Sequence, residues 1–328
     1  MKKLYSLILV VVALALGWWG YKNLSPEDVK KVVSQLLTKE AFTQAPPVKP
    51  DDTIRVASFN IQVFGEDKMQ NPNVVQVLVE ICRHFDIIAI QEIRSKGQNL
   101  LPLFVDQLNA DGSQYDFVIG PRLGRTDSKE QYAYIFDRAT IAVDRNQLYT
   151  LDDPDDLLHR EPLVGWFQAR GPQPEQAFTF SLVNIHTDPD EVDRELDVLD
   201  DVFFAVRDDG RQEDDVIMLG DFNANDAHLR QLGEVPNLGH VVADRPTNTR
   251  GTHEYDNILF DSLATPEFNG RGGVFDYMRE YNLSLEDALL VSDHLPVWAE
   301  FSVFEGGRPP EVAGRPGPAT QTPPSSPR

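Results

Sequence analysis

The chain has 328 residues, enough for one large domain or two ordinary ones, and its 41% hydrophobic and 25% charged residues are typical of a globular protein. Its 52 acidic and 30 basic residues give a formal net charge of −22, which disfavours a protein that holds nucleic acid through a basic surface. Contact with phosphate through a bound cation is not excluded. The single cysteine, Cys82, excludes an intrachain disulfide and a thiolate zinc cluster.

Residues 1–22 are predicted to direct the chain to a membrane. Two lysines precede an uncharged apolar run, 4–21, which has the length of a short membrane span. A cleaved signal peptide is the alternative, because two alanines within the run resemble a cleavage site. We favour an uncleaved anchor, since the run ends in tryptophan and tyrosine, which suit a membrane interface. In both readings the rest of the chain is exported to the cell envelope or beyond it.

The folded unit is expected to span residues 53–305. Before it, residues 23–52 are predicted to form a short helix and a Pro-rich linker. After it, residues 306–328 are rich in Pro, Gly and Ser and are predicted to be disordered. No internal repeat is visible, and we expect a monomer.

Strand and helix patterns alternate through this unit. A helix is expected to begin at Asn71-Pro72 and to bury a face with Val74, Val77, Leu78 and Ile81. A second helix is expected to carry the core stripe Val192, Leu196, Leu199 and Phe203. The predicted strands are 53–61, 86–92, 131–137, 140–144, 177–187, 215–223, 255–260 and 295–304. Many strands with few helices between them indicate an α/β or α+β sandwich.

Polar residues stand at the ends of these strands. One such residue is most simply a turn or a surface charge, but a set drawn from Asp, Glu, Asn and His is hard to explain by turns. If the strand ends converge, they form a single cleft at a sheet edge, where ligands bind in open α/β folds. The residues are Asn60, Glu92, His186, Asp221, Asn223, Asp256, Asp293 and His294.

The residue types limit the chemistry of this cleft. Carboxylate and amide oxygens suit Mg²⁺, Mn²⁺ or Ca²⁺. Imidazoles near carboxylates suit proton transfer at a phosphate, where a divalent ion neutralises the developing charge. The residues therefore predict metal-assisted hydrolysis of a phosphoester.

Seven segments also resemble the endonuclease/exonuclease/phosphatase superfamily, and in particular its deoxyribonuclease I branch. They are FNIQVFGEDKM (59–69), FDIIAIQEIR (85–94), GRTDSKEQYAYIF (124–136), VNIHTDP (183–189), MLGDFNAN (218–225), YDNILF (255–260) and VSDHLPV (291–297). The resemblance covers about residues 54–303 in the order of the family. It implies a four-layer sandwich, in which two mixed β-sheets pack face to face with helices outside.

The resemblance implies a set of metal ligands. Glu92 is the expected main ligand, with Asn60 beside it, and Asp293 is expected to hold the same ion or a second one. Mg²⁺ is the expected cofactor, with Mn²⁺ as an alternative. A structural Ca²⁺ is a further expectation for the loop 244–251, through Asp244, Thr247 and Thr249.

The resemblance also implies two catalytic imidazoles. His186 is expected to pair with Glu130, and His294 with Asp256. The resemblance leaves open which imidazole is the base and which is the acid.

Two further residues, Asp221 and Asn223, are implied to orient the attacking water and to bind the scissile phosphate. Arg94 is expected to contact substrate, where the branch has a minor-groove arginine. The chain departs from the branch at Gln62, in place of an arginine, and at Ser128, in place of an aromatic residue.

The predicted function is that of a membrane-tethered, exported, metal-dependent endonuclease that hydrolyses DNA. Because an aromatic contact to the DNA groove is missing, another phosphoester, such as a phospholipid headgroup or sphingomyelin, is the first alternative. A catalytically inactive binding module is the second, which the intact set of polar residues disfavours.

Overall fold

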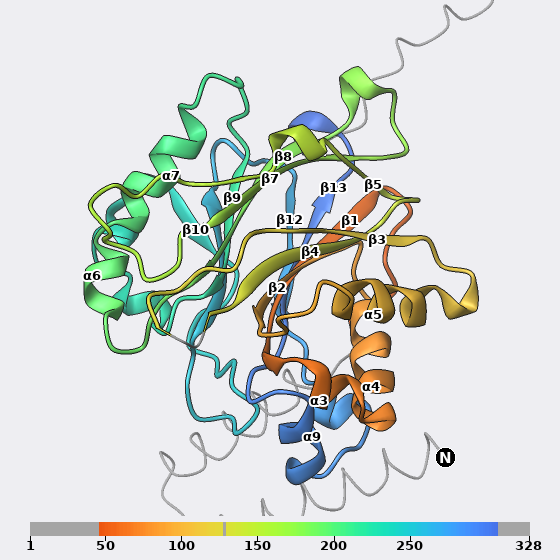
Figure 1. Cartoon of the computed structure of the whole chain (residues 1–328). Coiled ribbons are helices and arrows are strands. Elements are labelled where there is room, and N and C mark those ends of the chain that lie inside the picture. Colours follow the sequence, from red (N-terminus) through yellow and green to blue (C-terminus); the bar gives the residue numbers. More distant parts are fainter. Residues whose placement is uncertain (1–45, 127–128, 308–328) are drawn as a thin grey trace, which may run out of the picture.

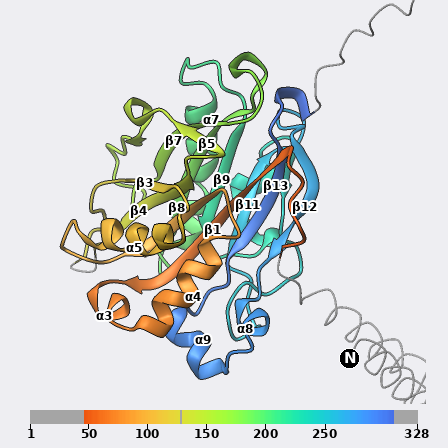
Figure 2. The same ribbon diagram turned by 90° about the vertical axis from the view of Figure 1, so that its right-hand side faces the viewer.

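A computed structural model describes residues 46–126 and 129–307, and in this part of the chain two β-sheets pack face to face between layers of helices (Figure 1). The predicted four-layer α/β sandwich is therefore confirmed. The view at right angles looks toward the outer face of one sheet and the helices that cover it (Figure 2).

The first sheet contains both ends of the folded unit. Among the described residues its strands are β1 (Thr53–Phe64), β2 (Ile87–Ile93), β3 (Tyr115–Ile119), β4 (Gln131–Asp137), β12 (Phe268–Val274) and β13 (Val297–Ser302). Their spatial order is β12-β13-β1-β2-β4-β3. Only the β1–β2 pair among these is parallel, which makes the sheet mixed.

The second sheet lies over the first. Its described strands are β5 (Ile141–Val143), β6 (Tyr149–Thr150), β7 (Leu163–Ala169), β8 (Thr179–His186), β9 (Val216–Asp221), β10 (Leu238–His240) and β11 (Asp256–Asp261). Their order is β10-β11-β9-β8-β7-β5, and β6 pairs with β7. The parallel pair is β8–β9, so the carboxyl ends of these two strands meet at the same edge.

Helices cover the outer faces of the two sheets. The α-helices of the described residues are α3 (Glu66–Met69), α4 (Pro72–Cys82), α5 (Leu100–Leu108), α6 (Val192–Leu196), α7 (Leu199–Arg207), α8 (Tyr277–Glu280) and α9 (Leu285–Val291). The 3₁₀ turns are η1 (Asn109–Asp111), η2 (Arg145–Gln147), η3 (Pro174–Gln176), η4 (Asp226–His228), η5 (Arg230–Glu234) and η6 (Glu305–Gly307).

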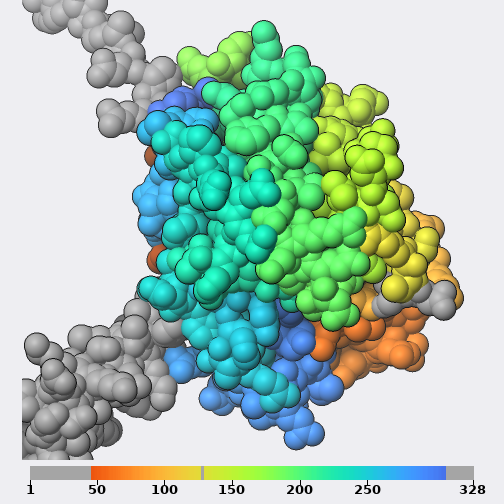
Figure 3. All heavy atoms as spheres, turned by 90° about the vertical axis from the view of Figure 1, so that its left-hand side faces the viewer, coloured from red at the N-terminus to blue at the C-terminus, as the bar shows by residue number. Residues whose placement is uncertain are grey.

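Three layers of apolar side chains hold these elements together. The middle layer lies between the sheets and includes stacked Phe178 and Phe180. The second layer lies between the first sheet and helices α4, α5, α8 and α9, and Leu78 and Phe104 are fully buried there. The third lies between the second sheet and helices α6 and α7. Figure 3 shows the molecular surface on the side of this third layer, which is formed mainly by residues of about 180–260.

The helix expected from Asn71-Pro72 is confirmed as α4, and the Asn71 side chain caps it by accepting hydrogen bonds from the backbone of Asn73 and Val74. The single helix expected from Val192 to Phe203 is wrong. The chain forms α6 and α7 there, because Asp197 ends one helix and Val198 adopts φ −117°, outside the helical range.

Several predicted segments lie outside the described residues, namely the membrane segment 1–22, most of 23–52, Ser128 and nearly all of 306–328. Within residues 46–126 and 129–307, no helix is both long and apolar enough to cross a membrane.

Candidate active site

Three neighbouring strands of the second sheet bring titratable side chains to one edge. Parallel pairing aligns His186, the last residue of β8, with Asp221, the last residue of β9. Antiparallel pairing aligns Asp221 with Asp256, the first residue of β11. The strand ends that the sequence marked with polar residues therefore meet in space.

Gly220 explains how β8 and β9 come close enough at this edge. A Cβ atom at this position would lie 1.9 Å from the carbonyl oxygen of Ile185, and φ of Gly220 is +152°. Only glycine fits both the conformation and the close approach. The glycine of the GDFN segment thus sets the position of Asp221.

The first sheet contributes a bulge to the same site. The β1–β2 register shifts between Asn60 and Phe64, and Gln62, Val63 and Glu92 all have positive φ, from 43° to 61°. Non-glycine residues in this region carry backbone strain, which concentrates at functional sites. The strain turns the Glu92 carboxylate toward the bulge, where it accepts a 2.8 Å hydrogen bond from the Val63 backbone N–H.

Lys68 holds this bulge in place, although the sequence assigned it no role. Its ammonium group donates hydrogen bonds of 2.6, 2.6 and 2.7 Å to the carbonyls of Ile61, Gln62 and Val291. Burial lowers the pKa of Lys68 to about 8, and the nearby carboxylates of Glu92 and Asp293 oppose that shift. The bulge and the C-terminal end of α9 are therefore joined through one partly buried cation.

The two predicted imidazoles face each other across Asp221. Nε2 of His186 lies 3.6 Å, and Nε2 of His294 3.5 Å, from the same oxygen, Oδ2 of Asp221. Behind the rings, Nδ1 of His186 lies 2.8 Å from Oε1 of Glu130. Nδ1 of His294 lies 2.9 Å from Oδ2 of Asp256. Each ring thus has one nitrogen bound to a buried carboxylate and the other turned toward a common centre.

The carboxylates favour the protonated form of both rings. Burial lowers the pKa of His294, but Asp256 and Asp221 outweigh it and raise this pKa to about 10. The pKa of His186 is also raised, because Glu130 and Asp221 outweigh its burial. The pKa of Glu130 is lowered, since the pairing with His186 outweighs burial. Both rings therefore bind a proton more tightly than a free imidazole does.

Two hydroxyl groups of the loop 244–251 fix the His294 pair. The Thr247 hydroxyl donates a 2.7 Å hydrogen bond to Oδ2 of Asp256. The Thr249 hydroxyl donates to the carbonyl of Ser292 at 2.7 Å. The calcium loop expected at 244–251 thus uses both threonine hydroxyls as donors within the site, and calcium binding there stays a prediction.

Arginines surround the Glu130 carboxylate. Nη2 of Arg94 lies 3.1 Å from Oε2 of Glu92 and 3.5 Å from Oε2 of Glu130. Nε of Arg160 lies 3.4 Å from Oε1 of Glu130 and donates a 3.2 Å hydrogen bond to the carbonyl of His186. Arg160 is buried and was missed from the sequence, because it lies in an irregular segment without a periodic pattern.

The predicted metal ligands offer hard oxygen atoms. Asn60 lies between two carboxylates, since its Nδ2 is 3.4 Å from Oε1 of Glu92 and 3.0 Å from Oδ2 of Asp221. Oδ1 of Asp293 is shielded from solvent and has no hydrogen-bond partner among the described residues. An unpartnered carboxylate oxygen that is shielded from solvent fits a hard divalent cation. Asp221, Asp256 and His294 form a further group with ligand atoms within 4.8 Å.

The Asn223 side chain is fixed next to Asp221. The backbone N–H of Asn223 donates to Oδ1 of Asp221 at 2.9 Å, and the side-chain Nδ2 donates to the carbonyl of Thr187 at 3.0 Å. One amide hydrogen of Asn223 therefore remains for a ligand.

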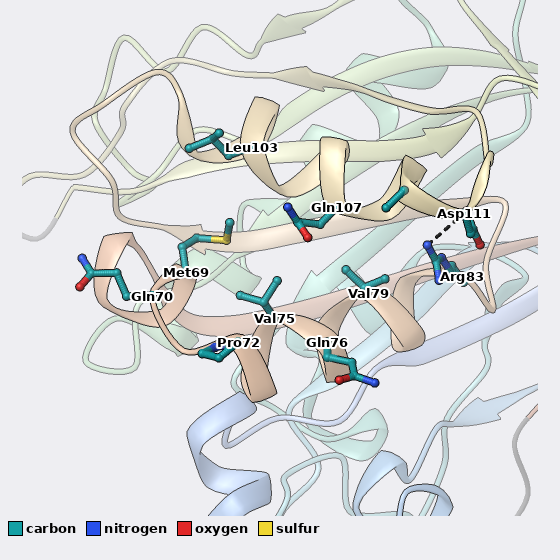
Figure 4. A pocket seen from close by; sticks show the side chains of 11 residues that line it. Met69, Gln70, Pro72, Val75, Gln76, Val79, Arg83, Leu103, Gln107 and Asp111 are labelled. Carbon is teal, nitrogen blue, oxygen red and sulfur yellow. Dashed lines mark ion pairs between the residues drawn. The ribbon is translucent and has the colours of Figure 1, made fainter.

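A groove lies elsewhere, between α4 and α5 (Figure 4). It has a volume of about 850 Å³, and the Arg83–Asp111 ion pair closes one end of it. Its lining combines that ion pair with three glutamines and apolar side chains such as Val75 and Leu103, and it includes none of the converging strand-end residues. The convergent polar edge, rather than this groove, is the candidate site.

Comparison with known proteins agrees with this geometry. The model of the endonuclease/exonuclease/phosphatase family matches residues 57–301. Deoxyribonuclease gamma of Rattus norvegicus is 34% identical over 262 residues, which cover 75% of this chain and 83% of that protein. Deoxyribonuclease-1 of Sus scrofa is 32% identical over 265 residues, which cover 75% of this chain and 90% of that protein.

Solved structures share the fold at lower identity. The crystal structure of D. rerio TDP2 humanized by 14 mutations superposes with a TM-score of 0.54 at 15% identity, over 77% of this chain and 100% of that one. The catalytic domain of human Nocturnin, with bound sulfate, superposes with a TM-score of 0.50 at 17% identity, over 80% of this chain and 100% of that one. These likenesses support the sandwich architecture alone.

Proposed function

Because this chain belongs to the endonuclease/exonuclease/phosphatase family, in its deoxyribonuclease I-like branch, we propose that it is a divalent-metal-dependent endonuclease of DNA. It is an enzyme that hydrolyses phosphoesters. The relatives in this branch are named deoxyribonucleases, and this favours DNA as the substrate.

A single observation carries the proposed chemistry: Nε2 of His186 and Nε2 of His294 both lie near Oδ2 of Asp221, at 3.6 and 3.5 Å. Hydrolysis of a phosphodiester needs one group to take a proton from water and another to give a proton to the leaving oxygen. Two imidazoles that converge on one point would supply both. Their carboxylate partners, Glu130 and Asp256, orient the rings and stabilise the protonated forms.

The other polar residues position the reactants. Asp221 accepts hydrogen bonds and would orient the attacking water, and the free amide hydrogen of Asn223 would donate to a phosphate oxygen. The Arg94 guanidinium, with a side chain that is 27% exposed, would contact the DNA strand next to the reacting phosphate.

Glu92, Asn60 and Asp293 would hold the metal ion. When bound, the ion would neutralise charge on the phosphoryl oxygens and provide the positive potential that a chain of net charge −22 lacks. Mg²⁺ is the ion that we propose, and Mn²⁺ offers the same ligand preferences.

A lipid phosphoester is a weaker candidate. The large apolar side chains exposed on the described residues are Val48, Val63, Leu103, Leu263, Leu285 and Leu290, and none is aromatic. An enzyme that works at a lipid surface would be expected to expose an aromatic segment there.

Plasmid DNA, RNA and sphingomyelin vesicles, each with Mg²⁺, Mn²⁺ or EDTA, test this proposal. We expect nicking of the plasmid that requires metal and stops with EDTA. Cleavage of the lipid without cleavage of DNA would show that the substrate is a lipid phosphoester, and the proposed hydrolysis mechanism would stand. Binding of DNA without turnover in any metal would overturn the enzymatic proposal and favour a binding module.

We further propose that the segment 1–22 anchors the enzyme on the exported side of a membrane, with the linker 23–52 before the catalytic unit. Fractionation of cells that express the full chain tests this. Release from membranes by high salt, or an N-terminus that begins after residue 15, would contradict an uncleaved anchor. Sedimentation of the detergent-solubilised protein tests the expected monomer.

A further inference from the structure

A second group of carboxylates lies at the end of β9 remote from Asp221. Asp215 directly precedes β9, and the six residues of the strand separate the two ends by about 20 Å. Glu267 directly precedes β12, and Glu305 lies in η6, after β13. Each of these three residues offers one carboxylate oxygen, and the oxygens lie within 4.8 Å of one another. The proposed reaction uses none of them.

Two of these carboxylates are buried without sufficient partners. Asp215 and Glu267 are each 1% exposed, whereas Glu305 is exposed. Oδ1 of Asp215 and Oε2 of Glu267 have no hydrogen-bond donor among the described residues, apart from a proton that the two carboxyl groups can share. The hydroxyl of Thr265, close enough to Asp215 to influence its pKa, is also buried and has no partner in good geometry in this part of the chain. Buried polar atoms without partners are costly, and they indicate a missing ligand when they gather at one place.

The charges around the group add to this cost. Glu213 and Asp214 lie directly before Asp215 and form an adjoining acidic group with it. Within residues 46–126 and 129–307, no Lys, Arg or His side chain forms an ion pair with these acids. Burial and, next to it, the Glu267 carboxylate raise the pKa of Asp215 to about 9. Without a protein cation, these acids are therefore neutralised by protons, which a bound divalent cation would replace.

We propose that Asp215, Glu267 and Glu305 form a calcium site that joins the two sheets. Ca²⁺ binds carboxylate and hydroxyl oxygens at 2.3–2.6 Å, so its ligands lie within about 5 Å of one another. The three carboxylates match that spacing, and the Thr265 hydroxyl next to Asp215 is a further ligand of the same type. Mg²⁺ fits less well, because it prefers a regular octahedron and keeps most of its water.

The position of the site indicates a structural role. Asp215 belongs to the second sheet through β9, whereas Glu267 and Glu305 flank β12 and β13 of the first sheet. The Gly306 backbone N–H donates to Oε1 of Glu267 at 2.5 Å, and the Thr179 N–H of β8 donates to Oε2 of Glu305 at 3.2 Å. A cation here would clamp the end of the sandwich opposite to the active site and hold η6 against both sheets.

Trp166 provides an optical probe of this site. Its indole N–H donates to Oε2 of Glu213 at 2.9 Å, and Oε1 of Glu213 accepts a 3.1 Å bond from the Asp215 backbone. Tb³⁺, which replaces Ca²⁺ on oxygen ligands, should therefore emit when Trp166 is excited. We expect emission from the full-length Glu92→Gln protein, in which the catalytic ion site is impaired, and competition by Ca²⁺. Trp166→Phe should lose the emission but keep Ca²⁺ binding.

Thermal unfolding separates a calcium site from a mere carboxyl pair. In EDTA, Asp215→Asn should unfold at a higher temperature than the wild type, because asparagine is neutral and needs no proton to be buried there. In Ca²⁺ the order should reverse, because the variant binds Ca²⁺ at least about tenfold more weakly. Glu305→Gln, a less buried change, should show the same reversal to a smaller degree. Asp155→Asn, an exposed matched change, should behave like the wild type in both media.

Failure of Ca²⁺ to stabilise the wild type or the Glu92→Gln protein would overturn the site. Equal stabilisation of Asp215→Asn and wild type would do the same, since the ion would then bind elsewhere. Stabilisation by Mg²⁺ with none by Ca²⁺ would overturn the choice of ion. None of these results depends on nuclease activity, so they do not bear on the proposed function.

Discussion

The hydroxyl of Ser292 donates a 2.6 Å hydrogen bond to the carbonyl of Asn60 and accepts a 3.0 Å bond from the backbone N–H of His294. Ser292 is fully buried. One side chain thus connects the end of β1, which carries the proposed metal ligand Asn60, with the loop that carries His294, a proposed catalytic imidazole. This connection would hold the proposed metal site and His294 at a fixed separation.

Ser292→Ala should lower both stability and activity. Two buried backbone groups lose their partner, which costs about 1–3 kcal/mol of unfolding free energy. We also expect kcat to fall by about tenfold or more, because a small displacement of His294 relative to the phosphate weakens proton transfer. Urea denaturation and steady-state nicking measure the two effects.

Ser262→Ala is the matched control for this change. The Ser262 hydroxyl also donates to a backbone carbonyl, that of Asn237, at 2.9 Å, but it is exposed and remote from the site. Its loss should cost well under about 1 kcal/mol and leave kcat unchanged. Equal effects of the two variants would contradict the connecting role of Ser292.

Gly220→Ala should be among the most damaging small substitutions in the chain. The added Cβ would lie 1.9 Å from the Ile185 carbonyl oxygen, so β8 and β9 would have to separate. We expect a loss of about 4 kcal/mol or more, or failure to fold. Gly270→Ala, at φ +81° with open space around it, should cost only the conformational strain of about 1–2 kcal/mol. Similar losses in chemical denaturation would show that the close approach of β8 does not matter.

Lys68→Met should weaken the bulge of β1. Three backbone carbonyls lose a charged donor, and the left-handed conformations of Gln62 and Val63 lose their support. We expect a cost of about 2–5 kcal/mol and faster hydrogen exchange in residues 61–65. Lys96→Met, at an exposed position, should change neither. Unaltered exchange in the Lys68 variant would argue against its anchoring role.

Much of the site was predictable because its residues end apolar strands. Asp221 and His186 follow buried runs, and a strand end can be recognised from sequence. Ser292, Lys68 and Arg160 were not predictable as supports, because their contacts join segments far apart in the chain. The strand β12, FNGRGGV, was also not predicted, because glycine is rare in strands. Here glycine is required by packing: a Cβ atom at Gly272 would lie 2.6 Å from the carbonyl oxygen of Trp298 in β13.

Glu195 should make stability depend on pH. Its carboxylate accepts hydrogen bonds from the backbone of His159 and Asp188, yet burial raises its pKa to about 7. A raised carboxyl pKa means that the folded state binds the proton more tightly. The protonated Glu195 therefore stabilises the folded state fully below pH 4.5. This contribution to the free energy of unfolding, about 3 kcal/mol, is lost as the pH rises to about 7.

Glu195→Gln removes this titration. The stability of the wild type relative to the variant should fall by about 3 kcal/mol between pH 4.5 and pH 8. Glu286→Gln, an exposed change of the same kind, should show no such trend. A constant difference between wild type and Glu195→Gln across this range would contradict the raised pKa.

The most direct measurement of the central claim compares His186→Ala and His294→Ala on two DNA substrates. One is ordinary, and the other has a bridging sulfur as leaving atom, which departs without a proton. On the ordinary substrate each variant should lose several orders of magnitude in rate. The sulfur substrate should restore the rate of one variant, in which the acid is missing, and not of the other, in which the base is missing. Near-normal cleavage of ordinary DNA by either purified variant would contradict a mechanism in which both imidazoles act across Asp221.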